Sequence, residues 1–396
     1  MKIIHTSDWH LGQTFFGHER GHEHKNFLDW LLGVIKSEKA DLLLLSGDTF
    51  DSHNPSAESQ KIYFNFIKEV TSQNPELQII ITAGNHDSAA RLEAPGPLLE
   101  NYNVTVRGVV SRTADGTYDY EKLIIPIKEG GCCLAVPYLR QGDYPTAESH
   151  SEGVKNFYHT LYNIAIEKYK FVIAMGHLQA SGALTSTDDR SERTTIGGLD
   201  QVTPFFSHKN IVYTALGHLH KAQRVCGREN MRYSGAPLPM SFAERDNKQS
   251  VTLLTINGND ADIKKIPFEA PVKLLSIPQV AQPIEEVLEE IKKIPAGEND
   301  KFTPFLEVKV LTEGPDPTRR QQIEKAVEGR AVRLARIVAV SANKSETENE
   351  IITYDEFKSI APLELAKIAY KQKYDNAEMP QDLEELLMEV IKEVEA

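Results

Sequence analysis

Short apolar runs alternate with helical patterns along the first part of the chain. The runs predict strands at residues 2–7, 41–46, 78–83, 131–137, 171–175 and 211–216. Residues 26–39 and 57–71 have the apolar spacing of amphipathic helices, and the pattern becomes β-rich around 232–241 and 249–256. Strands that alternate with helices form a sheet flanked by helices. The pattern therefore predicts a first α/β domain over residues 1–268.

A second, smaller unit is predicted at residues 272–341. Its pattern favours strands at 273–277, 306–310 and 332–340 and a helix at 283–294, whose apolar residues follow one face. Asp316 and Pro317 predict the N-cap and first turn of another helix that ends near Gly329. No cluster of His, Cys or carboxylates suited to chemistry occurs here. A structural or recognition role for this α+β domain is the better interpretation.

The C-terminal part predicts a helical segment at 353–396 after a polar linker at 342–352. Thr353 and Glu356 form a capping box, and a later helix has one apolar face with Leu383 and Leu387. Two short amphipathic helices have little core of their own. Either they pack on the body or they dock on a partner helix, and the pattern does not decide between the two.

Composition places the chain among globular proteins. It has 396 residues, 40% hydrophobic and 26% charged, which favours two or three domains. No apolar run approaches the ~18 residues of a membrane span, and the first residues lack a signal-peptide pattern. Cys132, Cys133 and Cys226 form no C-x-x-C pair. We therefore expect a cytoplasmic protein with reduced thiols and no membrane segment.

The negative charge is concentrated near the C-terminus. Residues 345–396 contain 14 Asp and Glu against 5 Lys, so −9 of the total charge of −13 lies there and the other 344 residues carry −4. No basic face is evident in the sequence. Strong DNA binding by this chain alone is therefore not predicted.

The first strand ends in an unusual pair of polar residues. In MKIIHTSDWH, Asp8 and His10 follow two isoleucines, where an ordinary turn would contain Gly, Asn or Pro. In an extended segment, residues i and i+2 point to the same side. Both side chains could therefore face one point, although a single D-x-H motif is usually accidental.

Further ligand types follow other predicted strands, each after a glycine. The blocks are Gly47-Asp48-Thr49-Phe50-Asp51, Gly84-Asn85-His86-Asp87, Gly176-His177 and Gly217-His218-Leu219-His220. The glycine permits a sharp turn at the carboxyl edge of the sheet, where sites form in α/β proteins. Together with Asp8 and His10, these four blocks give five groups of candidate ligands at successive strand ends, which makes coincidence improbable.

The residue types indicate a pair of metal ions. Seven candidate ligands provide the O and N atoms that suit manganese, iron or zinc: Asp8, His10, Asp48, Asn85, His177, His218 and His220. If Asp48 bridges, each metal receives four protein ligands, and paired metals can activate water for attack at phosphorus. His86 remains outside this set and could protonate a leaving alkoxide. Asp87 could hold the His86 ring in one tautomer.

The motifs D-x-H, G-D-x-x-D, G-N-H-D, G-H and G-H-x-H in this order resemble the calcineurin-like metallophosphoesterases. The match is closest to the SbcD family, bacterial relatives of the Mre-type double-strand-break nucleases. It rests on HTSDWHLGQ, FLDWLL, GDTFDSHNPS, AGNHDS, ALGHLHKAQ and YSGAPLPMSFAE. The resemblance covers nearly the whole chain and is most specific before residue 250.

This resemblance implies a β-sandwich flanked by helices and a manganese-dependent DNA nuclease, with magnesium as a possible substitute. The family acts as a 3′→5′ exonuclease and a hairpin-opening endonuclease. By family pattern, Asp8, His10, Asp48 and His220 hold one metal, Asp48, Asn85, His177 and His218 hold the other, and His86 is catalytic.

The resemblance also implies partners. The unit at 272–341 corresponds to a capping domain, and the helical segment at 353–396 to one that docks on SbcC, an SMC-like ATPase. A homodimer within a heterotetramer, at the nucleoid, is expected. In the helix at 57–71, Phe64 lies outside the apolar arc, which gives modest support to a dimer. Phe15 and Phe16 could contact DNA bases or pack within a loop.

Two other functions are compatible with the same motifs. A phosphatase or cyclic-nucleotide diesterase would use the same two-metal chemistry on a smaller phosphoester. However, GDTFDSHNP and GNHD differ from the phosphatase patterns G-D-x-V-D-R-G and GNHE. A non-catalytic scaffold with this fold would be expected to lose ligands, and here all seven and His86 are present.

Overall fold

The computed structural model describes residues 1–184, 201–203, 208–258, 260–312, 314 and 316–341, with isolated positions 363, 367, 370, 379, 380, 383, 384 and 387. The chain divides into two compact units, Met1–Val340 and Ser341–Ala396. The first unit contains the elements discussed below. The predicted helical segment at 353–396 lies mostly outside the described residues, so its helices and its linker remain predictions.

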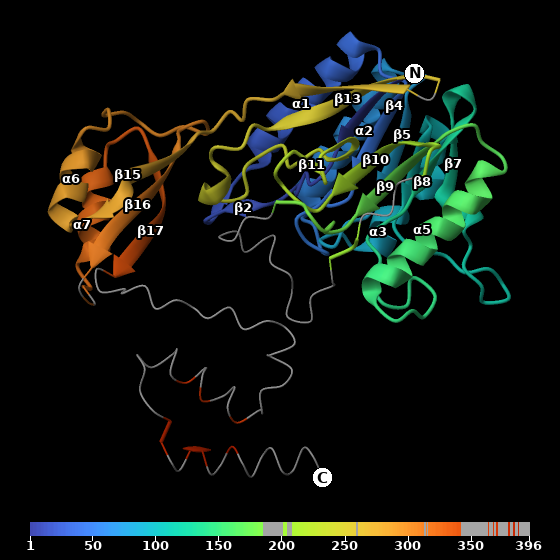
Figure 1. The fold of residues 1–396 in the computed structure, drawn as a ribbon. Helices are drawn as coiled ribbons and strands as arrows, with labels where there is room; N and C mark the ends of the chain where they lie inside the picture. The colour runs from blue at the N-terminus through green and yellow to red at the C-terminus, as the bar shows by residue number, and fades with distance from the viewer. Residues whose placement is uncertain are drawn as a thin grey trace. The chain divides into compact units, whose positions relative to one another are not determined.

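Two six-stranded sheets form the centre of the first unit (Figure 1). The first sheet has the order β14-β13-β1-β4-β5-β6, and the second β11-β12-β10-β9-β8-β7. In the first, β1, β4, β5 and β6 are parallel, while β13 and β14 run antiparallel to their neighbours. In the second, β8, β9, β10 and β12 are parallel. The carboxyl ends of the parallel strands therefore share one edge in each sheet.

The strands of the first sheet are β1 (Lys2–Thr6), β4 (Leu42–Ser46), β5 (Gln78–Thr82), β6 (Val104–Arg107), β13 (Ser250–Asn257) and β14 (Asp260–Pro267). Those of the second are β7 (Ile124–Ile127), β8 (Gly131–Ala135), β9 (Val172–His177), β10 (Ile211–Gly217), β11 (Gln223–Val225) and β12 (Arg228–Tyr233). The helices are α1 (Gly21–Glu38), α2 (Ala57–Gln73), α3 (Ala89–Glu93), α4 (Gly96–Leu99) and α5 (His150–Ile166).

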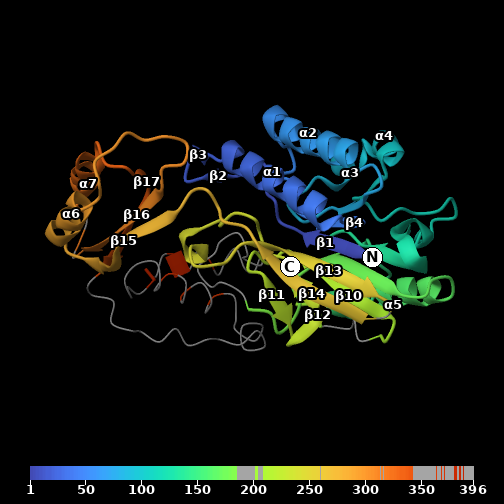
Figure 2. The same cartoon turned by 90° about the horizontal axis from the view of Figure 1, so that it is seen from above.

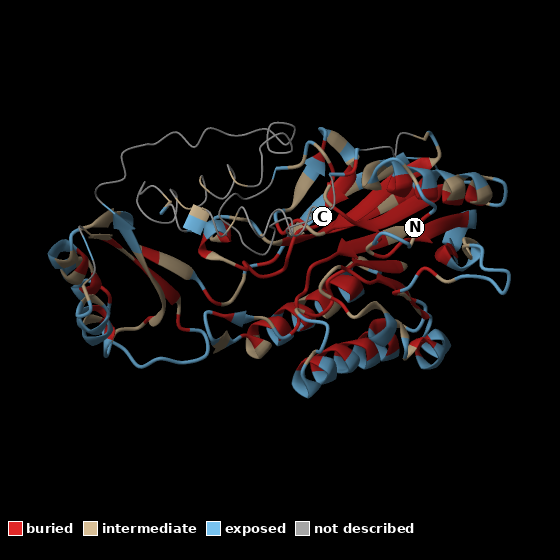
Figure 3. Ribbon diagram, turned by 90° about the horizontal axis from the view of Figure 1, so that it is seen from below, coloured by how far each residue is buried: buried red, intermediate tan, exposed pale blue. Residues whose placement is uncertain are grey.

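The two sheets pack face to face, and helices cover their outer faces. Leu42 and Leu44 of β4 pack with Ile173 and Tyr213 of the second sheet in one core cluster. Leu43 and Leu45 of the same strand point the other way and pack against α1 and α2. A third cluster lies between the second sheet and α5. Figure 3 shows the strands as mostly buried and the outer faces of the helices as exposed.

A three-stranded sheet with two helices follows the sandwich (Figure 2). It contains β15 (Leu274–Gln282), α6 (Ile284–Lys292), β16 (Phe305–Thr312), α7 (Arg319–Val327) and β17 (Arg333–Ser341), with a core of its own. Below, this part is called the cap. A short hairpin of β2 (Thr14–Phe15) and β3 (His18–Glu19) contacts it. Within the described residues, no helix is long and apolar enough to span a membrane.

The expected fold class is confirmed, since the chain forms a mixed α/β sandwich with flanking helices. One predicted detail of the cap is wrong. Asp316 does not cap a helix that starts at Pro317, because Thr318 precedes the first helical residue, Arg319. The Asp316 carboxylate instead accepts a hydrogen bond of 2.9 Å from the Thr318 backbone N–H and forms a local turn.

His5 in β1 makes stability depend on pH. Its ring is fully buried beside the Tyr213 hydroxyl at 2.9 Å, and burial lowers the pKa of His5 to about 3. Below about pH 6.5, His5 becomes protonated in the unfolded chain but stays neutral in the folded one. The free energy of unfolding therefore falls as the pH drops through that value.

We expect His5 to destabilise the metal-free fold by about 2 kcal/mol at pH 5 relative to pH 7.5. Urea titrations in chelator at both pH values measure this difference. His5→Gln should reduce it by that amount, and the exposed His159→Gln should leave it unchanged. An equal pH dependence in all three proteins would contradict the assignment.

Candidate metal centre

All seven predicted ligands lie at the carboxyl ends of strands, where the two sheets meet. Asp8 and His10 follow β1, Asp48 follows β4, and Asn85 follows β5. His177 ends β9, and His218 and His220 follow β10. Both sheets therefore contribute, and the site is built across the sandwich. Most of these side chains are buried, while Asn85, His86 and His218 are partly exposed.

The backbone at four of these ligands is left-handed. The φ angles are 55° at Asp8, 46° at His10, 50° at Asp48 and 106° at His218. The expectation that Asp8 and His10 converge through an extended backbone is therefore wrong. Two backbone hydrogen bonds hold the segment instead. The Asp8 N–H donates to the Gly47 carbonyl oxygen and the His10 N–H to the Asp48 carbonyl oxygen, each at 3.0 Å. Such conformations are uncommon for residues other than glycine and are frequent at functional sites.

The glycines of the motifs serve mainly close packing. Gly47 has a φ of 85°, as a sharp turn requires. Gly84 is not left-handed, but a Cβ there would lie 2.1 Å from Asp48 Oδ1. A side chain at this position would thus displace the candidate bridging carboxylate. The sequence pattern was informative, although the physical reason differs between the two positions.

The ligand atoms form overlapping groups. Asp8, His10 and His220 make one set, Asp8, Asp48 and His177 a second, and within each set the ligand atoms lie within 4.8 Å of one another. Asn85 Oδ1 lies 2.9 Å from His177 Nε2 and 3.1 Å from His218 Nδ1. The seven side chains thus form one continuous cluster of oxygen and nitrogen donors. Its composition suits divalent transition metals.

Three imidazoles are oriented by an acceptor at Nδ1. That atom lies 2.9 Å from the Ser46 carbonyl oxygen in His177, 2.9 Å from Glu244 Oε1 in His220, and 3.2 Å from Asp51 Oδ1 in His10. A carbonyl or an ionised carboxylate can only accept, so Nδ1 carries the proton and Nε2 is left to bind a metal. Among the described residues, the buried His10 Nε2 has no hydrogen-bond partner, as expected for an atom that binds a metal ion.

The charges of the cluster are strongly coupled. Burial alone would raise the pKa of Asp48, but His177 outweighs it and holds the pKa of Asp48 far below its usual range. Burial would likewise lower the pKa of His177, but Asp48, 3.3 Å from Nε2, raises it to about 9. Without metal, a proton on His177 therefore balances the Asp48 carboxylate. Metal binding has to release that proton.

His86 lies at the edge of the cluster. Its backbone N–H donates a 2.8 Å hydrogen bond to Asp48 Oδ1, and its Nδ1 lies 2.9 Å from the Asp51 carbonyl oxygen. The carbonyl fixes the proton on Nδ1, so Nε2 is the atom available for chemistry. The His86 ligand atom also lies within 4.8 Å of those of His10 and Asp48. Position alone therefore permits contact with a metal or with a substrate oxygen.

The expected role of Asp87 is corrected. This carboxylate is fully buried and accepts hydrogen bonds from the backbone N–H groups of Thr49, Phe50 and Gly84 at 2.9–3.1 Å. The His86 ring contacts Asp51, not Asp87. Burial and the nearby Asp48 charge raise the pKa of Asp87 to about 6. Asp87 thus joins the Asp48 and Asn85 loops, and no hydrogen bond among the described residues connects it with the His86 ring.

Two orienting carboxylates were not assigned from the sequence. Asp51 stands in the quoted G-D-x-x-D block, so its spacing from Asp48 was a usable signal. Glu244 is the last residue of the quoted YSGAPLPMSFAE segment, 24 residues after His220, but the motif does not indicate its role, and only the fold brings the two side chains together. Phe15, a candidate for contact with bases, is instead buried against Phe242 and Phe305.

Comparison with known proteins agrees with this geometry. The calcineurin-like phosphoesterase family matches residues 1–222, which include all seven ligands. A second family, described as the type 5 capsule protein repressor C-terminal domain, matches residues 270–374. The first match covers the two-sheet part with the cluster, and the second begins where the cap begins.

The relatives share most of their length with this chain. The SbcD subunit of the nuclease SbcCD from Rhodobacter capsulatus is 36% identical over 353 residues, which is 85% of this chain and 86% of that protein. The protein of the same name from Escherichia coli K12 is 33% identical over 69% of this chain and 70% of its own. The one from Bacillus subtilis 168 is 29% identical over 64% and 66%. The chain therefore belongs to the calcineurin-like phosphoesterase family and, within it, to the group of the SbcD nuclease subunits.

Proposed function

We propose that this chain is the nuclease subunit of an SbcCD-type complex, which hydrolyses DNA phosphodiesters with two divalent metal ions, most readily Mn²⁺. The observation that carries the proposal is the single cluster of seven O and N donors beside His86. The relatives are named as nuclease subunits, and this supports DNA as the substrate. By the same likeness, the activities are a 3′→5′ exonuclease and a hairpin-opening endonuclease.

In this proposal, Asp8, His10, Asp48 and His220 hold one metal ion, and Asp48, Asn85, His177 and His218 hold the other. A bound pair supplies an activated water and neutralises charge on the attacking and leaving oxygens. The residues of the chain fix where this happens. The acceptors at His10, His177 and His220 keep each Nε2 aimed at the centre.

His86 is the proposed proton donor. With Nδ1 held by the Asp51 carbonyl oxygen, a doubly protonated ring would present Nε2–H to the leaving oxygen and transfer that proton as the P–O bond breaks. His86 is partly exposed, as contact with a substrate requires. Asp87 maintains this arrangement, because it ties the His86 loop to the Asp48 loop.

The partner in this proposal is an SMC-like ATPase of the SbcC type, in the cytoplasm at the nucleoid. The names of the relatives support it, since they refer to a nuclease, SbcCD, of which the relative is one subunit. The acidic C-terminal segment, 353–396, is the proposed docking element, and in this proposal the ATPase provides most of the affinity for DNA. This division of labour suits a chain with a net charge of −13.

The test is cleavage of an end-labelled DNA hairpin and a linear duplex by the full chain, with Mn²⁺, with Mg²⁺ and with chelator. We expect cutting that depends on Mn²⁺. No DNA cutting, with hydrolysis of an aryl phosphodiester retained, would favour a smaller phosphoester as the substrate. No hydrolysis of either substrate, alone or with the ATPase partner, would favour a scaffold.

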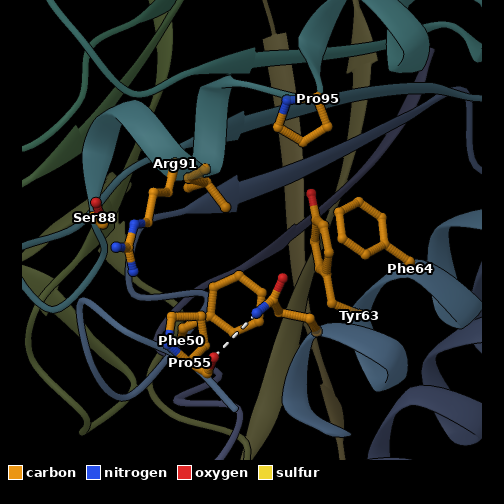
Figure 4. A pocket seen from close by; sticks show the side chains of 9 residues that line it. Phe50, Pro55, Tyr63, Phe64, Ser88, Arg91 and Pro95 are labelled. Atoms are coloured by element: carbon orange, nitrogen blue, oxygen red, sulfur yellow. Dashed lines mark hydrogen bonds between the residues drawn. The ribbon is translucent and has the colours of Figure 1, made fainter. Parts of the chain in front are cut away.

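A second copy of this chain is the proposed partner of the α2 surface. Phe64 on α2 is 39% exposed and Leu98 on α4 is 71% exposed. Between α2 and α3 lies a pocket of about 60 Å³, lined by Phe50, Tyr63, Phe64, Arg91 and others (Figure 4). An apolar surface with a pocket suits insertion of a side chain from a second copy.

We expect Phe64→Glu to shift the full chain from dimer to monomer in light scattering, because a buried unpaired charge opposes association. The matched control is Val280→Glu in β15, which is 77% exposed and lies in the cap. Equal dimer dissociation constants in both variants would exclude this surface as the dimer interface.

A further inference from the structure

A short 3-10 turn, η4 (Phe242–Glu244), carries the carboxylate that orients His220. Glu244 is buried, with Oε1 2.9 Å from His220 Nδ1 and Oε2 accepting a 2.9 Å hydrogen bond from the Met240 backbone N–H. Both oxygens of the carboxylate are therefore engaged. The orientation of the His220 ring depends on where this turn lies.

The other end of the same turn lies in the contact with the cap. Phe242 is buried in a cluster with Phe15, Val272 and Phe305. The Arg336 guanidinium of β17 lies 5.3 Å from the centre of the Phe242 ring and 5.3 Å from that of Phe16. Glu307 of β16 pairs with Arg336 and holds it there. The position of η4 is thus set partly by the cap.

The hairpin β2–β3 makes a second connection of this kind. It begins just after His10, whose carbonyl oxygen accepts a 2.9 Å hydrogen bond from the Gln13 N–H. Phe15 of the hairpin lies 4.9 Å from Phe305, measured between ring centres. His18 of the hairpin lies 5.1 Å from Phe305 by the same measure. His10 therefore lies only a few residues before a hairpin that contacts the cap.

The remaining ligands are held differently. His177 is oriented by Ser46 of β4, and Asn85 contacts both His177 and His218. These hydrogen bonds join residues of the sandwich alone. A disturbance at the cap should consequently reach the group of Asp8, His10 and His220 before it reaches the group of Asn85, His177 and His218.

We infer that Glu244 is a positioning residue for His220, and that η4 and the β2–β3 hairpin make one of the two metal sites depend on the docked cap. The inference rests on the proposed two-metal function. It assigns the two sites different sensitivities: the site of His10 and His220 responds to the position of the cap, and the site of His177 and His218 does not. Orientation of metal-bound histidines by a second carboxylate typically changes metal affinity by about 10–100-fold.

The test is Mn²⁺ titration of the full chain, followed by calorimetry and by electron paramagnetic resonance, which distinguishes paired from single Mn²⁺. Wild type should bind two ions. Glu244→Ala should weaken one site about 10–100-fold and leave the other unchanged, so single-ion spectra appear at intermediate Mn²⁺. Glu244→Gln keeps one oxygen that can accept from Nδ1–H but turns an NH2 group toward the Met240 N–H, so it should recover only part of this loss.

The link to the cap is tested by Arg336→Ala with Lys309→Ala as its matched control. Both side chains pair with Glu307, but it is the Arg336 guanidinium that lies over the rings of Phe16 and Phe242. Arg336→Ala should weaken the same single site about 3–10-fold, and Lys309→Ala should not.

The outcomes separate the inference from the proposed function. Two sites of wild-type affinity in Glu244→Ala would overturn the role of Glu244. Equal behaviour of the Arg336 and Lys309 variants would overturn the dependence on the cap. Absence of Mn²⁺ binding by the wild type would instead contradict the two-metal function. If Glu244→Ala does not fold, the comparison of Arg336→Ala with Lys309→Ala still tests the inference, because neither change removes the contact between Glu244 and His220.

Discussion

Replacing Asp48 by asparagine is expected to remove both metal ions at once. The Asp48 carboxylate lies 3.3 Å from His177 Nε2 and 3.6 Å from His10 Nε2, so it reaches into both halves of the cluster. Asparagine keeps the size but loses the charge that a bridging ligand needs to hold two cations. We expect Mn²⁺ affinity to fall about 100-fold or more at each site and phosphodiester hydrolysis to fall by a factor of roughly 10³ or more.

The matched control is Asp41→Asn. Asp41 precedes the amino end of the same strand, β4, and pairs with Lys128 at 3.0 Å, far along the strand from the cluster. Its variant should bind two Mn²⁺ and remain active. Two bound ions in Asp48→Asn would rule out Asp48 as the bridge. Loss of only one would place it in a single site.

Replacing His86 by alanine is expected to separate catalysis from metal binding. His86 Nδ1 lies 2.9 Å from the Asp51 carbonyl oxygen, so in the proposed mechanism Nε2 is the atom that donates the proton. Loss of a positioned proton donor typically costs about 10²–10⁴-fold in rate. The affinity for Mn²⁺ should stay within about twofold of wild type, since the seven ligands remain. Single-turnover cleavage of a labelled hairpin, beside an Mn²⁺ titration, measures both quantities.

His159 on α5 provides the comparison for His86. It is exposed on the outer side of the second sheet, and His159→Ala should change neither the cleavage rate nor the Mn²⁺ affinity. A large loss of Mn²⁺ in His86→Ala would make His86 a ligand, which its proximity to His10 and Asp48 allows. An unchanged cleavage rate would remove His86 from the mechanism.

The cluster of candidate ligands could be predicted from the sequence because its residues lie at the ends of strands. A buried strand is recognisable from its apolar run, and parallel strands bring their carboxyl ends together. Asp48, Asn85 and His177 were found in this way, and the structure brings them into one cluster. The reasoning needed only local patterns and a general rule about sheets. The fold class was predictable for the same reason.

The supporting contacts could not be read in that way. Glu244 reaches His220 across a loop, and Asp87 serves three backbone N–H groups from two loops. Neither contact leaves a periodic signal, because each depends on the final position of a turn. The hairpin β2–β3 was also missed, since its strands of two residues are too short to show a period. Tertiary placement decided these features.

The left-handed backbone at Asp8, His10, Asp48 and His218 has a consequence for how this family can change over time. A glycine would adopt these angles more easily than the residues that are present. Selection for chemistry and selection for a stable fold therefore act in opposite directions at the same positions. Once a lineage no longer needs hydrolysis, drift toward glycine at these loops would relax the backbone. The ligands would then be lost early, while the sandwich that once held them persists.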